Sequence, residues 1–198
     1  MNSTPLANPD DAPPAALVLV RHGRTALNAA GRLRGLLDPP LDDVGLADVA
    51  RLADRLAPML ADGRPHRILA SPLQRTVRTA RMIGDRAGLS FTVDERLLDR
   101  DYGQWAGHPR DEVIAQWGSV DAAPGVEPLA NVLARAGGFL DEPVADPPLV
   151  LVTHDAVLHA ILGALDPDLA DIPLDPASWS LLARDGAGAL TVTSTNNH

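Results

Sequence analysis

LVLVRHGRTALN (residues 17–28) joins a run of apolar residues directly to two arginines that flank a histidine and a glycine. Consecutive apolar side chains rich in branched residues are typical of a strand buried on both faces of a parallel sheet. The charged residues follow at the point where this strand must end. Because ligands bind at the carboxyl ends of strands in open α/β sheets, the stretch predicts a binding site around Arg21 and His22.

A second stretch, LVLVTH (residues 149–154), repeats this pattern of an apolar strand that ends in a histidine. DAVLHAILGAL (residues 155–165) follows it and has the composition of a buried helix. If the two strands are parallel, their carboxyl ends meet at one edge of the sheet. The pattern therefore places His22 and His154 at the same edge.

The clearest helix start follows a short apolar strand at residues 67–70, in the segment SPLQRTVRTARMIGDRAG. Here we expect Ser71 to be the N-cap, Pro72 the first helical residue and Gln74 the partner in a capping box. Gly88 is expected to end this helix. Arg75 then lies in the first turn, near the same sheet edge.

Strands that alternate with helices indicate an α/β fold, namely a three-layer sandwich with a mainly parallel central sheet. A third strand is predicted at residues 90–93, and a closing hairpin at residues 178–194 with Asp185 and Gly186 in its turn. An amphipathic helix is predicted from apolar residues spaced three to five apart, namely Val44, Val49, Leu52, Leu56 and Leu60.

The chain has 198 residues, which suits a single domain. We expect residues 1–14, rich in proline, aspartate and alanine, to form a disordered arm, and residues 15–198 to form the domain. Residues 94–148 are irregular in pattern. Loops and short helices are expected there, including a small lid around residues 106–128.

The amino-acid composition excludes several kinds of ligand and site. The formal net charge of −9 argues against nucleic acid or a membrane surface as the ligand, and all 17 basic residues are arginine. The chain has no cysteine, which excludes disulfides and thiolate metal sites. No apolar stretch is long enough to span a bilayer, so we expect a soluble cytoplasmic protein.

Two imidazoles among guanidinium groups repel each other and any metal cation unless an anion lies between them. Arginine binds phosphate oxygens bidentately, and exposed N–H groups at the helix starts after Ser71 and His154 add donors. A neutral imidazole held there can attack phosphorus, while a nearby carboxylic acid protonates the leaving oxygen. This chemistry requires no metal and no cofactor.

Six ordered motifs resemble the histidine phosphatase superfamily, in its phosphoglycerate-mutase-like branch. The resemblance spans about residues 16 to 182 and implies that branch's α/β sandwich. Its motifs are RHGRT with Asn28, GRLRG (31–35), SPLQRTVRTA (71–80), DYGQWAG (101–107), PGVE (124–127) and VTH (152–154).

The resemblance implies that His22 is the nucleophile and that Arg21, Arg75 and His154 bind the phosphoryl group. The family usually has a glutamate as general acid and base four residues before the glycine of the YG pair. Here Asp99 occupies that position, and its side chain is shorter by one methylene, about 1.5 Å of reach. Either the backbone of residues 97–103 moves inward or another carboxyl acts, with Glu95 and Asp101 as alternatives.

The resemblance also implies a set of residues that bind substrate. Arg24 and Asp155 depart from the usual family residue, and together with Arg100 they are expected to shape the leaving-group pocket. Glu127 either orients an arginine of the phosphate pocket or lies on the surface. The remaining implied binding residues are Gly23, Thr25, Asn28, Arg32 and Thr153.

The function predicted from these residues is a metal-independent phosphatase that hydrolyses a small phosphomonoester through a phosphohistidine. Two alternatives stay open: a phosphoglycerate-mutase-type phosphotransferase, and a non-catalytic module that binds a phosphorylated ligand. The sequence does not identify the phosphorylated metabolite, and it leaves open whether the chain forms a homodimer.

Overall fold

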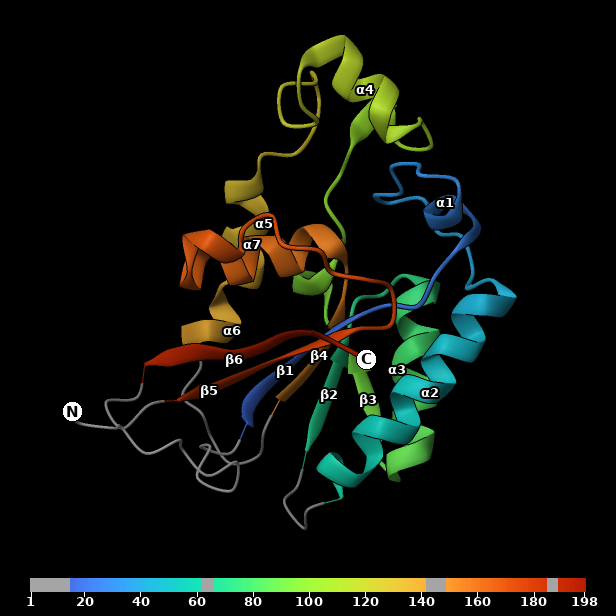
Figure 1. Cartoon of the computed structure of the whole chain (residues 1–198), viewed down its shortest axis with the longest axis vertical. Coiled ribbons are helices and arrows are strands. Elements are labelled where there is room, and N and C mark those ends of the chain that lie inside the picture. The colour runs from blue at the N-terminus through green and yellow to red at the C-terminus, as the bar shows by residue number, and fades with distance from the viewer. Residues whose placement is uncertain (1–14, 62–65, 142–148, 185–188) are drawn as a thin grey trace, which may run out of the picture.

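The computed structural model describes residues 15–61, 66–141, 149–184 and 189–198. Their centre is a six-stranded sheet in the order β3-β2-β4-β1-β5-β6 (Figure 1). The first four strands in this order are mutually parallel, β5 is antiparallel to β1, and β6 is antiparallel to β5. The strands are β1 (Ala15–Arg21), β2 (Arg67–Ala70), β3 (Phe91–Val93), β4 (Leu149–Thr153), β5 (Trp179–Arg184) and β6 (Leu190–Asn197).

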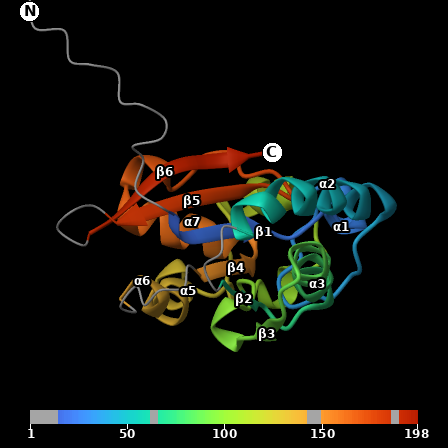
Figure 2. The same ribbon diagram turned by 90° about the horizontal axis from the view of Figure 1, so that it is seen from below.

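Helices cover both faces of the sheet, as the three-layer prediction requires (Figure 2). Helices α2 (Asp43–Leu60) and α3 (Gln74–Ala87) lie on one face, and α5 (Leu129–Ala136), α6 (Gly138–Asp141) and α7 (Asp155–Leu165) lie on the other. Alternate residues of β1 serve the two cores: Val18 and Val20 pack with α2 and α3, whereas Leu17 and Leu19 pack with α5 and α7. The predicted α/β sandwich is confirmed.

The predicted start of α3 is wrong by two residues. The helix begins at Gln74, and its N-cap, Leu73, contributes no side-chain hydrogen bond. Asp38 caps the helix instead, because its carboxylate accepts the backbone N–H of Gln74 at 2.8 Å and its carbonyl accepts the Gln74 side chain. The Ser71 hydroxyl lies 2.8 Å from Nε2 of His154, so Ser71 belongs to the edge of the sheet rather than to the helix.

The predicted amphipathic helix is α2, which buries Val49, Leu52, Leu56 and Leu60. Val44, in its first turn, is 46% exposed and lines a surface cavity instead. Gly88 ends α3 in the left-handed conformation, as predicted. β5 and β6 form the expected antiparallel pair, while Asp185, Gly186 and residues 1–14 lie outside the described residues.

A separate lobe stands beyond the carboxyl ends of β1 and β4 (Figure 1). It contains α4 (Arg110–Trp117) and the short 3-10 helix η3 (Gly103–Trp105), and it includes the predicted lid region. Leu33, from the loop after α1 (Ala26–Ala29), packs against Tyr102 and Val113 in a hydrophobic cluster of its own. The two loops that border the sheet edge therefore share one small core.

Two further 3-10 turns complete the described elements: η2 (Glu95–Leu97), which leads toward the lobe, and η4 (Pro167–Leu169), which follows α7. Within the ranges described above, no helix is long and apolar enough to cross a membrane.

Gly84→Ala tests the packing of α3 against the turn that follows it. Alanine normally stabilises a helix interior by up to about 1 kcal/mol relative to glycine. Here a Cβ would lie 2.5 Å from the Leu89 carbonyl oxygen. We expect the unfolding free energy to fall by about 1–3 kcal/mol, as overpacking does. Urea denaturation measures it.

Gly138→Ala is the matched control, because a Cβ there would meet only an Arg96 nitrogen at 3.8 Å. Equal stabilities for the two variants would contradict the packing described for α3.

Candidate active site

His22 directly follows β1, with its side chain fully buried. Its Nδ1 lies 2.6 Å from the carbonyl oxygen of Gly23. Because a carbonyl only accepts hydrogen bonds, this contact places the proton of the neutral ring on Nδ1. Nε2 is then left with a free lone pair, and it is buried without a hydrogen-bond partner among the described residues.

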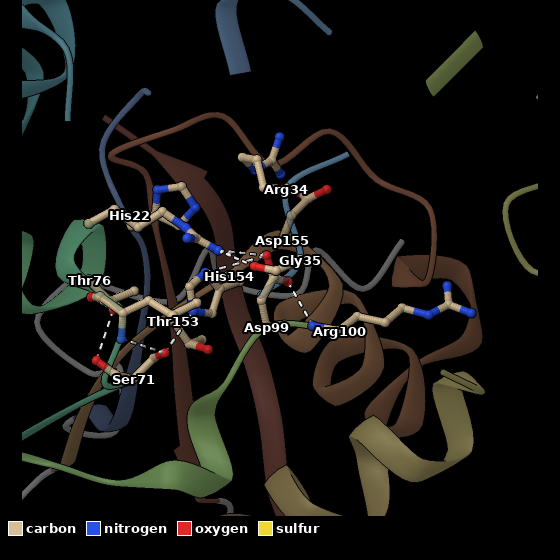
Figure 3. A network of polar contacts seen from close by, with 12 residues as sticks. His22, Arg34, Gly35, Ser71, Thr76, Asp99, Arg100, Thr153, His154 and Asp155 are labelled. Atoms are coloured by element: carbon tan, nitrogen blue, oxygen red, sulfur yellow. Dashed lines mark hydrogen bonds and ion pairs between the residues drawn. The ribbon is translucent and has the colours of Figure 1, made fainter. Parts of the chain in front are cut away.

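His154 lies beside His22 because β1 and β4 pair in parallel, with Arg21 opposite Thr153. The two ring centroids are 5.1 Å apart, and the planes cross at 60°. Nε2 of His154 contacts the Ser71 hydroxyl, and Nδ1 lies 3.7 Å from the Asp99 carboxylate. Figure 3 shows both imidazoles in one space with Asp99. The structure thus brings the two sequence-predicted histidines together.

Arg21 and Arg75 reach the same space from β1 and α3. Arg21 pairs with Asp155 at 3.1 Å and also donates to the Leu174 carbonyl. Arg75 is fully buried and donates to the Asp99 carboxylate at 2.9 Å. Each guanidinium keeps a buried Nε with no partner in the described part of the chain. Both arginines therefore retain a donor for a ligand.

Arg75 is also held in place by carbonyl oxygens. It donates to the carbonyl of Gly35 at 2.9 Å and to that of Leu37 at 2.7 Å. These contacts anchor the loop after α1 to the sheet edge, so the loop and the phosphoryl-binding arginine are placed together.

Arg34 is a site residue that sequence reasoning missed. Figure 3 shows it across the imidazole pair from Ser71, and its positive charge lowers the pKa of both histidines. Its Nε is buried and has no partner within the ranges that the structure describes. Arg32 was predicted instead, but it is exposed and donates to the Gly107 carbonyl at 2.7 Å. Residues two apart in GRLRG carry the same chemistry, so only the path of the loop separates them.

Burial and the surrounding charges keep both imidazoles neutral. Burial is the largest cause that lowers the pKa of His22 well below its usual range, followed by His154 and Arg75. Burial, then Arg75 and Arg34, likewise lowers the pKa of His154. With neutral imidazoles, the three arginines around them carry three positive charges, and the carboxyl groups of Asp99 and Asp155 can offset two of these at most. The site between the imidazoles and the arginines therefore suits an anionic ligand.

Among the three candidate acids, only Asp99 lies in the site. Its side chain is 2% exposed, and Oδ1 accepts the backbone N–H of Arg100 at 2.9 Å. Glu95 is exposed on η2, and Asp101 is exposed with its carboxylate bonded to the Gly103 N–H. The shorter aspartate reaches Arg75 and His154 from the backbone position that the structure gives it.

Four of the predicted binding residues support the site's backbone. A Cβ on Gly23 would lie 2.5 Å from Val49, so only glycine fits beside the nucleophile. Thr25 and Asn28 cap α1 reciprocally, which directs the Asn28 amide oxygen to Thr25. The buried Thr153 hydroxyl donates to the Leu97 carbonyl at 2.8 Å.

Two other predicted residues bind protein groups away from the imidazoles. Arg24 pairs with Asp42 at 3.0 Å and lines a separate surface cavity. Arg100 pairs with Asp121 at 2.5 Å. Glu127 pairs with Arg135 rather than with an arginine of the phosphate pocket. Among the described residues, no group of three or more side chains has the makeup of a metal site.

Three comparisons with known proteins agree on the kind of chain this is. The profile of the histidine phosphatase superfamily (branch 1) matches residues 17–197. Glucosyl-3-phosphoglycerate phosphatase of Mycolicibacterium vanbaalenii is 31% identical over 189 residues, covering 86% of this chain and 80% of that protein. A probable phosphoglycerate mutase of Yersinia pestis is 34% identical over 161 residues, covering 74% and 73%.

A solved structure of mycobacterial glucosyl-3-phosphoglycerate phosphatase in complex with VO3 superposes with a TM-score of 0.79 at 28% identity. The superposition covers 92% of this chain and 98% of that one.

The lowered pKa values of His22 and His154 predict how stability depends on pH. In the unfolded chain a histidine takes up a proton near pH 6.5, whereas the folded chain resists it. Stability is therefore fully present above pH 6.5 and is lost as the pH falls toward the lower folded pKa values. The expected slope is at most about 1.4 kcal/mol per pH unit for each histidine.

Denaturant titrations between pH 7.5 and 5 in phosphate-free buffer measure this slope. The His22→Gln, His154→Gln double variant should give a shallower one. An unchanged slope would show that the buried imidazoles do not cause the effect.

Proposed function

Since the chain belongs to the histidine phosphatase superfamily, branch 1, we propose that it hydrolyses a small phosphomonoester through a phosphohistidine formed on His22. The chain is a phosphoric monoester hydrolase of this superfamily. The observation that carries the proposed site is a set of buried nitrogens with no hydrogen-bond partner in the described part of the chain: Nε2 of His22, Nδ1 of His154, and Nε of Arg21, Arg34 and Arg75.

The first half-reaction forms a bond between Nε2 of His22 and phosphorus. The phosphorus–oxygen bond to the leaving group breaks, and the departing oxygen takes its electron pair and a proton from Asp99. Arg21, Arg34 and Arg75 stabilise the charge that develops on the phosphoryl oxygens. Because His22 is neutral, its lone pair is available without prior loss of a proton.

In the second half-reaction, water attacks phosphorus and gives a proton to the Asp99 carboxylate. The nitrogen–phosphorus bond then breaks, its electron pair returns to Nε2, and inorganic phosphate leaves. Asp99 thus acts as an acid in the first step and as a base in the second, and it takes from water a proton that replaces the one lost to the leaving oxygen.

The leaving group must contact the acid that protonates it, so a cavity lined by Asp99 is its natural place. A cavity of about 490 Å³ adjoins Asp99, a volume in the range of small-molecule sites. Four oxygen-bearing side chains and one guanidinium form its polar lining: Asp99, Asp101, Glu127, Asn131 and Arg135. Such acceptors favour a leaving group rich in hydroxyls, so we propose a phosphorylated polyol or sugar derivative as the substrate.

Transfer back to a phosphoglycerate is the second candidate, because one relative carries the name of a probable mutase. A mutase must keep its phosphohistidine away from water. The cavity beside Asp99 has room for a water molecule next to this base, which favours hydrolysis. A binding module without turnover is the third candidate, and the proposed chemistry distinguishes it by phosphate release.

Rapid acid-free quenching with a labelled phosphomonoester tests the proposed function. We expect label on the protein that is stable to base and labile to acid, as a phosphohistidine is. His22→Ala should abolish both the label and phosphate release, with EDTA having no effect on the wild-type enzyme. Binding of the phosphomonoester with neither covalent label nor release of phosphate would support the module, and label passed mainly to a second phosphoglycerate would support the mutase.

A series of substrates tests the leaving-group proposal. We expect kcat/KM for sugar or polyol phosphates to exceed that for alkyl phosphates of matched size by about tenfold, the worth of one or two hydrogen bonds. The common phosphoryl group is the internal control. Equal values across the series would contradict a role for the oxygen-lined cavity.

A further inference from the structure

The loop that carries Asp99 is held by its carbonyl groups. Four successive carbonyl oxygens, from Arg96 to Asp99, each accept a hydrogen bond from a side chain. Arg135, on α5, donates to the carbonyls of Arg96 at 3.0 Å, Leu98 at 2.5 Å and Asp99 at 3.0 Å. Thr153, at the end of β4, donates to the remaining one, Leu97, at 2.8 Å.

Arg135 is itself oriented by Glu127. The guanidinium lies 3.4 Å from both carboxylate oxygens of Glu127. Glu127 also accepts the backbone N–H of Asp101 at 3.0 Å, and its own N–H donates to the Asp101 carbonyl at 2.8 Å. The backbone is therefore held on both sides of Asp99, by two elements that lie outside the loop.

The hydrogen bonds to this backbone affect how far the Asp99 carboxylate extends into the site. Aspartate is shorter than glutamate by one methylene, about 1.5 Å. Asp99 nevertheless places Oδ2 at 2.9 Å from Arg75 and 3.7 Å from Nδ1 of His154. A short side chain reaches these groups only if its backbone is close to them. A misplacement of about 1 Å in a reacting group can cost about a hundredfold in rate.

We propose that Arg135 is the positioning residue of the general acid: with Thr153, it holds the backbone of residues 96–99 forward so that Asp99 reaches the leaving oxygen. This inference rests on the proposed function of Asp99. Arginine suits the task because its planar fork carries five donors and can serve three carbonyls and a carboxylate at once. A lysine at this position has one nitrogen and cannot span them.

The test is Arg135→Lys, measured as the first-turnover rate of leaving-group release. An alkyl phosphate needs Asp99 to protonate its leaving oxygen, whereas nitrophenolate leaves without a proton. We expect the rate with the alkyl phosphate to fall about 10- to 100-fold, because a displaced acid loses part of the roughly 10²- to 10⁴-fold that general acid catalysis contributes. The rate with nitrophenyl phosphate and the inhibition constant of inorganic phosphate should change less than threefold.

Rescue by a longer acid distinguishes positioning from a general structural role. In the Arg135→Lys background, Asp99→Glu should raise the first-turnover rate with the alkyl phosphate at least fivefold, since the added methylene offsets a retreat of the loop. Asp99→Asn in the same background should restore nothing. Thr153→Val, which removes only the bond to Leu97, is the second variant and should show the same substrate pattern with a smaller loss.

Three results would overturn the proposal: an equal loss with both substrates, a weakened affinity for inorganic phosphate that accounts for the loss, or no rescue by Asp99→Glu. Failure of the proposed function would look different. In that case the wild-type protein itself would form no phosphohistidine, whatever residue stands at position 135.

Discussion

Repulsion among like charges is the constraint around which this molecule is organised. Arg21, Arg34 and Arg75 converge on two buried imidazoles, and such a gathering is stable only if the histidines stay neutral and an anion balances the excess charge. The parallel pairing of β1 with β4 sets the histidines side by side. Asp155 pairs with Arg21 and Asp99 pairs with Arg75, which leaves the charge of Arg34 for the ligand. A phosphoryl group meets this need in both charge and geometry.

The rigid strands and the irregular loops of the site position different functional residues. Buried strands present the two histidines, whose positions tolerate little error because one must attack phosphorus. Loops present Asp99 and Arg34, and each loop is tied back to the frame by hydrogen bonds to its carbonyls: Arg75 holds residues 35–37, and Arg135 and Thr153 hold residues 96–99. Buried side chains thus give irregular segments the fixed geometry that strands have intrinsically.

The sequence predicts the sandwich and the pair of histidines because both depend on local patterns, namely apolar runs and the residues that end them. Prediction from the sequence fails where a residue distant along the chain determines the local structure. Ser71 has the signature of an N-cap, yet Asp38, 36 residues before Gln74, caps α3, and the Ser71 hydroxyl contacts His154. Arg32 and Arg34 are equivalent in sequence, and only the bridge of Arg32 to the strand-like segment at Pro109 separates them. Arg135 resembles an ordinary cation in the last turn of a helix, so nothing local signals its contact with Asp99.

The lobe above the site has a small core of its own, formed by Leu33, Tyr102, Val113, Val120 and Ala123. Because these residues are absent from the two cores that flank the sheet, the lobe's interior can be altered without unfolding the sandwich. A substitution inside the lobe can therefore alter the surroundings of a leaving group, since Val126 packs against this core and lines the cavity beside Asp99. The histidines at the sheet edge keep the positions that the paired strands give them.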